Sequence, residues 1–142
     1  LIPNGVRVVD IGSGAGLPGV VIALARPDLK VTLVEPLQRR VDFLNEVVVE
    51  LNLPIEVIRG RAETVKKQFE IVTARAVAPL EKLIQISWHM IPKGGLLLAI
   101  KGESAAAEIT ATKLKKGSSS QLHEIKLDNL QLIRVVEIKK GA

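Results

Sequence analysis

Residues 8–19 have the sequence VVDIGSGAGLPG, which places four glycines within eight positions directly after a β-branched run. The apolar run predicts a buried strand over residues 7–11, and Val20 begins a stretch of apolar residues that suits a helix packed on a sheet. A glycine loop between such a strand and helix lets a ligand approach the backbone closely. The sequence therefore predicts a ligand loop or, more simply, a tight turn.

The rest of the chain alternates in the same way. The predicted strands are residues 7–11, 30–34, 55–58, 71–73, 96–100, 122–126 and 132–138. The predicted helices are residues 20–25, 39–51, 80–90 and 104–116, the last with Ser104 as its N-cap. A further, short polar helix is predicted to end at Lys67. Residues 117–120 (GSSS) are interpreted as a flexible turn. This order predicts a parallel, doubly wound α/β sheet that ends in an antiparallel hairpin.

Ligands of such sheets bind at the carboxyl ends of the strands, near the point where the strand order reverses. Four segments meet there if the predicted strands are correct. They are residues 10–19, 35–36, 60–63 and 73–78. The candidate site is therefore spread over four loops rather than held in the glycine loop alone.

The length, composition and net charge of the chain exclude several classes of function. The chain has 142 residues, a length typical of one domain, and no cysteine, which excludes disulfides, thiolate catalysis and cysteine-rich zinc sites. Its two histidines, His89 and His123, are isolated, so we expect no metal site. A net charge of +5 suits a polyanionic partner, although many basic proteins have none. No signal peptide or apolar span is visible, and we expect a cytoplasmic protein without a membrane partner.

Asp10 discriminates between the ligands that a glycine loop can hold. Gly14, Gly16 and Gly19 fit the dinucleotide pattern G-x-G-x-x-G, which is weak alone, and the Gly-Lys-Ser/Thr of a triphosphate loop is missing. A carboxylate at the end of the first strand would repel a pyrophosphate. S-adenosylmethionine has a sulfonium and an ammonium group and no phosphate, so Asp10 favours that cofactor.

Two further acids extend the site. Glu35 follows Gly16 by nineteen residues, at the end of the second strand, where a carboxylate can accept hydrogen bonds from both ribose hydroxyls of either adenosine cofactor. Glu63 follows the third strand, where the loop would meet the adenine edge. Glu63 could instead be an ordinary acidic residue at the N-terminus of a helix, where the helix dipole favours a negative charge.

These segments resemble the ribosomal RNA small-subunit methyltransferase G family, also called glucose-inhibited division protein B. The resemblance covers about residues 5–103. Its motifs are VDIGSGAGLPG (9–19), LVEP (33–36), GRAE (60–63), TARAVA (73–78) and AIKG (99–102). It implies a Rossmann-like class I S-adenosylmethionine-dependent methyltransferase with a mostly parallel seven-stranded sheet. It also implies that the enzyme methylates N7 of a guanosine in small-subunit (16S) ribosomal RNA.

The resemblance also implies which residues contact S-adenosylmethionine. Carried onto this sequence, the contacts are Gly12, Leu17, Ala62, Glu63 and Arg75, with Glu35 at the ribose. Asp10 and Gly14 of the glycine loop complete the predicted site.

The chain departs from the family in two places. Glu70 stands where the family usually has an aspartate before the fourth strand. The resemblance implies an N-terminal helical segment ahead of the first strand, which we do not find in this sequence. From its length, residues 1–142 are interpreted as a single methyltransferase domain.

The reaction needs no general base, because guanine N7 has a free lone pair and no proton, and the sequence identifies no catalytic residue. Methylation of a pyrimidine carbon by the usual covalent route would require a cysteine, and this chain has none, so the sequence argues against that reaction. Two alternatives stay open: an NAD-dependent oxidoreductase, and an RNA-binding or assembly module without turnover. Phe43 is expected in the core. Candidates for phosphate contacts are Arg39, Arg40, Arg59, Arg61, Lys66, Lys67, Lys93 and Lys101.

Overall fold

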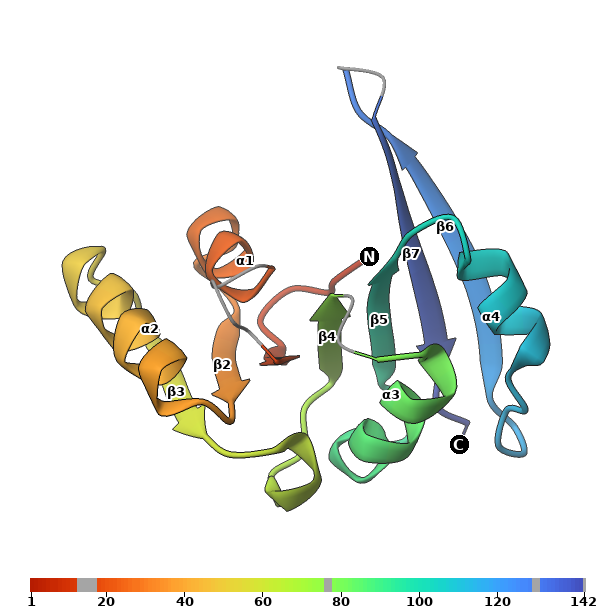
Figure 1. Cartoon of the computed structure of the whole chain (residues 1–142), viewed down its shortest axis with the longest axis horizontal. Coiled ribbons are helices and arrows are strands. Elements are labelled where there is room, and N and C mark those ends of the chain that lie inside the picture. The colour runs from red at the N-terminus through yellow and green to blue at the C-terminus, as the bar shows by residue number, and fades with distance from the viewer. Residues whose placement is uncertain (13–17, 76–77, 129–130, 142) are drawn as a thin grey trace.

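A computed structural model describes residues 1–12, 18–75, 78–128 and 131–141. Its sheet has seven strands in the order β3-β2-β1-β4-β5-β7-β6 (Figure 1). The strands are β1 (Arg7–Ile11), β2 (Lys30–Glu35), β3 (Ile55–Arg59), β4 (Ile71–Arg75), β5 (Leu96–Lys101), β6 (Ser119–Lys126) and β7 (Leu132–Lys139). The strands β1 to β5 pair in parallel, while β7 runs antiparallel to both β5 and β6. The predicted fold class is confirmed.

Helices cover both faces of the sheet. They are α1 (Gly19–Ala25), α2 (Gln38–Glu50), α3 (Leu80–Ser87) and α4 (Ala105–Ala111), with 3₁₀ turns η1 (Ala62–Thr64) and η2 (Trp88–Met90). Successive strand residues face opposite sides, so Val8 joins a core with Ala23 of α1 and Leu44 of α2. Val9 joins the other core, with Leu83 of α3. Figure 1 shows α1 and α2 beside β1 to β3, and α3 and α4 beside β4 to β7.

The strand order reverses between β1 and β4. From β1 the chain proceeds through β2 to β3 at one edge, whereas from β4 it proceeds to β5 on the other side. The loops that follow β1 and β4 therefore diverge, and a crevice opens at the carboxyl ends of these strands. The register aligns Ile11 with Val34 and with Ala74, so the three strands end at the same level. This is the edge at which the sequence predicts the site.

Several helix boundaries differ from the prediction. The helix expected over residues 104–116 ends at Ala111, since Thr112 is extended (φ −94°, ψ 126°). Ser104 holds the N-cap position, but its hydroxyl donates to the Glu108 carboxylate instead of capping the backbone.

Other expectations also need correction. The short helix predicted to reach Lys67 is only the 3₁₀ turn η1, and the predicted turn 117–120 already contains the start of β6. The helix expected over residues 80–90 ends at Ser87 and continues as η2. Phe43 is 48% exposed on α2, so its prediction as a core residue was wrong. In the described parts of the chain, no helix is long and apolar enough to cross a membrane.

Candidate functional site

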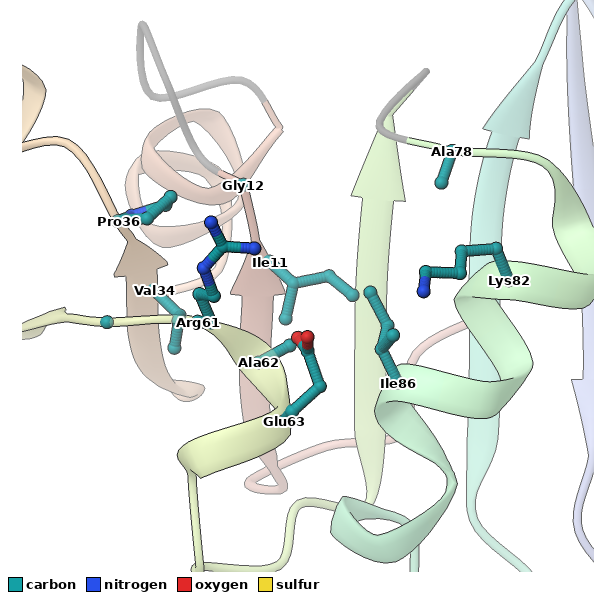
Figure 2. Close-up of a pocket in the computed structure, with 11 residues that line it drawn as sticks. Ile11, Gly12, Val34, Pro36, Arg61, Ala62, Glu63, Ala78, Lys82 and Ile86 are labelled. Carbon is teal, nitrogen blue, oxygen red and sulfur yellow. The ribbon is translucent and has the colours of Figure 1, made fainter.

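A cavity of about 250 Å³ lies at the carboxyl ends of β1, β2 and β3, opposite α3 (Figure 2). Its walls combine small and apolar residues with three charged side chains. The lining residues are Ile11, Gly12, Val34, Pro36, Gly60, Arg61, Ala62, Glu63, Ala78, Lys82 and Ile86. All four predicted loops contribute to it, the fourth through Ala78.

Asp10 lies behind this cavity and joins two elements. It is fully buried, and its Oδ1 accepts a hydrogen bond from the Thr73 hydroxyl of β4 at 2.8 Å. Its Oδ2 accepts a hydrogen bond from the backbone N–H of Gly19, the first residue of α1, at 3.1 Å. The carboxylate therefore faces the positive end of α1 and links the first residue of that helix to β1 and β4.

Gly12 begins the glycine loop and lines the cavity. Its φ of +67° is in the left-handed region that favours glycine, and its N–H donates to the Val34 carbonyl oxygen at 2.9 Å. This hydrogen bond continues the pairing of β1 with β2 by one residue, and the positive φ then ends the strand. Gly14 and Leu17, two further predicted contacts, lie outside the described residues.

Glu35 ends β2 with a side chain that is 1% exposed. Its Oε2 accepts a hydrogen bond from the Leu37 N–H at 2.9 Å, and its Oε1 lies 3.8 Å from the guanidinium of Arg40. The residues on either side of it, Val34 and Pro36, both line the cavity. The carboxylate is thus held at the cavity's edge in a fixed orientation.

Ala62 and Glu63 follow β3 and form part of the cavity wall. The Gly60 N–H donates to the Glu35 carbonyl oxygen at 3.0 Å, which keeps this loop against the end of β2. Figure 2 shows the Glu63 carboxylate and the Lys82 ammonium directed into the space between β1 and α3. An acceptor and a donor therefore face the cavity from opposite walls.

Arg75 ends β4 and is exposed. It lies in register with Ile100 of β5, and the described lining of the cavity contains Ala78 rather than Arg75 itself. Of the predicted site residues, the structure brings Gly12, Ala62 and Glu63 together in the cavity. Asp10 and Glu35 do not line it but adjoin residues that do, and Arg75 ends β4, the strand beside β1.

Several residues that line the cavity were not predicted from the sequence. Lys82 and Ile86 come from α3, four residues apart on one helix face, and they reach the cavity only because α3 packs across the end of β1. Their spacing predicts a shared face but not what that face contacts. Ile11, Val34 and Pro36 adjoin predicted residues and could have been named from the strand ends.

The chemistry of the cavity suits a flat ligand with polar edges. Ile11, Val34, Ala62 and Ile86 supply apolar walls, and Glu63 supplies a hydrogen-bond acceptor. Among the described residues, no group of three or more His, Cys, Asp or Glu side chains could hold a metal ion.

Comparisons with known proteins identify a family. Residues 1–134 match the model of the family described as rRNA small subunit methyltransferase G. The chain is 62% identical over 112 residues to ribosomal RNA small subunit methyltransferase G of Thermobifida fusca, covering 77% of this chain and 47% of that protein. It is 56% identical over 113 residues to the protein of the same name from a Nocardioides species, covering 78% of this chain and 45% of that protein. The chain thus spans about half the length of these curated relatives.

The fold also matches a solved structure. A methyltransferase from Pyrococcus furiosus superposes with a TM-score of 0.81 and 16% sequence identity, covering 100% of this chain and 78% of that chain. At this identity the match concerns the fold alone. The predicted Rossmann-like methyltransferase fold is therefore confirmed.

Proposed function

The chain belongs to the rRNA small subunit methyltransferase G family, and we propose that it acts in S-adenosylmethionine-dependent methylation of guanosine N7 in small-subunit (16S) ribosomal RNA. The membership confirms the resemblance inferred from the motifs. The activity, cofactor and substrate of this chain are our proposals, and the following observations support them.

The observation that carries the proposal is the position of Asp10. In dinucleotide-binding folds, amides at the N-terminus of the first helix bind the pyrophosphate. Here the N–H of Gly19 already donates to the Asp10 carboxylate at 3.1 Å, and that carboxylate is fully buried. A pyrophosphate at this helix end would meet a fixed negative charge in a poorly screened setting. A cationic, phosphate-free cofactor meets no such repulsion.

The residues of the cavity fit the adenosine part of S-adenosylmethionine. Ile11, Ala62 and Ile86 would contact the faces and edges of the adenine, and the Glu63 carboxylate would accept a hydrogen bond from its amino group. Glu35 would accept hydrogen bonds from the ribose hydroxyls.

The loop and the next strand would contribute the remaining contacts. Gly12 lets the ligand approach the backbone, and the same role is proposed for Gly14. Leu17 and Arg75 complete the proposed contacts.

The reaction makes few chemical demands on the chain. When bound, S-adenosylmethionine supplies an electrophilic methyl group. Guanine N7 presents a lone pair and no proton, so no side chain of this protein has to act as a base. The residues must instead hold the two partners in line and exclude water, and such positioning can lower a barrier by roughly 7–11 kcal/mol.

The partner that we propose is small-subunit ribosomal RNA, alone or in the ribosomal subunit. The net charge of +5 favours binding to phosphates. Arg39, Arg59, Arg61 and Lys66 are exposed around β3 and α2, beside the cavity. Lys101 is not available for this role, because its side chain is only 7% exposed. We propose the cytoplasm as the location, since the proposed substrate is found there.

The decisive experiment is transfer of a labelled methyl group from S-adenosylmethionine to small subunits that lack the modification. We expect the full-length protein to label 16S ribosomal RNA at N7 of a guanosine, mapped by mass spectrometry of nuclease fragments. Retained RNA binding with no incorporation would favour the module without turnover instead.

Calorimetry with S-adenosylhomocysteine tests the cofactor site separately. We expect Glu35→Gln to weaken binding by about tenfold or more, because hydrogen bonds to a charged group are worth about 1.5–3 kcal/mol. The matched control is Glu56→Gln, an exposed glutamate of β3, which we expect to bind normally. Tight binding of NADH with no response to S-adenosylhomocysteine would reverse the choice of cofactor in favour of an oxidoreductase.

A further inference from the structure

A largely buried ion pair lies beyond the cofactor cavity, at the carboxyl end of β5. The side chain of Lys101, the last residue of that strand, is 7% exposed, and its Nζ lies 3.2 Å from Oε1 of Glu108. The same ammonium donates a hydrogen bond to the carbonyl oxygen of Ala78, in the loop between β4 and α3. Lys101 therefore links the end of β5 to a residue that lines the cofactor cavity.

Glu108 belongs to α4, so it extends this link to that helix and also to α3. Its Oε1 also accepts a hydrogen bond from the N–H of Leu80, the first residue of α3, at 2.9 Å, and its Oε2 accepts one from the Ser104 hydroxyl at 2.8 Å. Burial acts to raise its pKa, but the hydrogen bonds from Ser104 and Leu80 and the ammonium of Lys101 hold that pKa below its usual value. The Glu108 carboxylate is therefore charged at neutral pH.

The ion pair lines a cavity that adjoins the cofactor cavity. A second cavity of about 470 Å³ is lined by Lys101, Glu108, Ala78, Pro79 and Gly102, among others. Ala78 lines this cavity and the cofactor cavity alike. Any displacement of Ala78 would thus change the wall between the two spaces.

Stability alone is a weak reason for such a pair. Removing charges from water costs free energy, and apolar side chains of similar volume often stabilise a protein equally well. Apolar residues could not, however, bond the Ala78 carbonyl oxygen and the Leu80 N–H at once. What the ion pair supplies is a defined position for Ala78 and for the start of α3.

We propose that Lys101 and Glu108 are positioning residues for methyl transfer, which hold Ala78 so that an accepting base in the second cavity meets the cofactor in the first. The inference rests on the proposed function and deepens it. Neither residue touches the reacting atoms. They act through the backbone of Ala78, the residue that lines both cavities.

The test compares Lys101→Met with Lys101→Arg in the full-length protein. The readouts are the single-turnover rate of methyl transfer to undermethylated small subunits at saturating S-adenosylmethionine, and the dissociation constant for that cofactor. We expect Lys101→Met to transfer at least about tenfold more slowly, because a displacement of 1 Å can cost a factor of about 100. Its cofactor affinity should stay within about threefold of normal. Lys101→Arg, which keeps the charge and the donors, should restore most of the rate.

Two matched variants complete the design. Lys30→Met makes the same change at an exposed lysine at the amino end of β2. The proposed site lies at the carboxyl ends of the parallel strands, so this variant should transfer at the normal rate. Glu108→Gln keeps an acceptor for Leu80 but loses the charge, and should slow transfer by an intermediate factor even if Lys101→Met fails to fold.

A normal rate in folded Lys101→Met would overturn the inference and leave the proposed function intact. Equal losses of rate and cofactor affinity in both Lys101 variants would also overturn it, because they would indicate a merely structural role. Failure of the unaltered protein to transfer any methyl group would instead overturn the proposed function.

Discussion

Glu70 joins the starts of two neighbouring strands through a single side chain. Its carboxylate accepts hydrogen bonds from the backbone N–H of Arg7 at 3.2 Å and from the guanidinium of Arg7 at 2.9 Å. Arg7 begins β1, and Glu70 directly precedes β4. The hydrogen bonds from Arg7 hold the pKa of Glu70 below its usual value. The glutamate, which departs from the family's usual aspartate, thus has a defined role at the amino end of the sheet.

That pKa shift predicts how stability depends on pH. In the folded state the pKa of Glu70 is lower than in the unfolded chain, where it is about 4.3. Its stabilising contribution is therefore fully present above that value and is lost as the pH falls through the folded pKa. We expect Glu70→Gln to lower the melting temperature slightly at pH 7, and the difference from the unaltered protein to vanish on acidification. Circular dichroism between pH 7 and pH 3 measures both.

The control for this prediction is Glu46→Gln, at an exposed position of α2. It should change the melting temperature little at any pH. If Glu70→Gln showed the same difference from the unaltered protein at pH 3 as at pH 7, the ion pair with Arg7 would not be its cause.

Among the elements, α1 depends on an unusually close approach to the sheet. A Cβ atom at Gly19, its first residue, would overlap the side chain of Leu33 in β2 and lie 2.9 Å from Oδ2 of Asp10. Because both neighbours are buried, neither can move away freely. The last glycine of the loop therefore serves helix packing, whereas Gly12 serves the turn.

Gly19→Ala should consequently destabilise the protein by about 1–3 kcal/mol, the usual cost of overpacking. Urea unfolding followed by circular dichroism measures this free energy. Gly102→Ala makes the same change where a Cβ would meet no other atom within 4 Å, and should be nearly neutral. Equal stability of the two variants would show that α1 can shift away from β2 at little cost.

The elements also show what could be predicted from the sequence. The apolar run of β1 gives the predicted bounds, residues 7–11, because a buried strand is marked by its own residues. The end of α4 was missed because no glycine or proline marks it before Gly117, whereas Thr112 is already extended. For the site, the four segments were predicted because loops after parallel strands converge, and the resemblance to the family then implied Gly12 and Glu63 within them. Lys82 was not predicted, since its place depends on how α3 packs.

At the scale of the whole molecule, both cavities open at one edge of one sheet. The reversal of strand order between β1 and β4 separates the loops that follow them, and Ala78 lies where the two cavities meet. Two apolar cores, one on each face, hold these strand ends in place. A ligand in the cofactor cavity would touch β1, β2, the loop after β3 and α3 at once. Its binding should therefore stabilise the fold as a unit.

This coupling predicts a ligand-dependent melting temperature. A ligand that binds only the folded state stabilises it by about 2.7 kcal/mol at 100 times its dissociation constant. For a domain of this size, S-adenosylhomocysteine at that concentration should raise the melting temperature by roughly 8 °C. NADH at the same concentration should leave it unchanged, because Asp10 occupies the helix amide that a pyrophosphate would need. A shift with NADH alone would show that the buried carboxylate does not select against phosphate, and the choice of cofactor would have to be reversed.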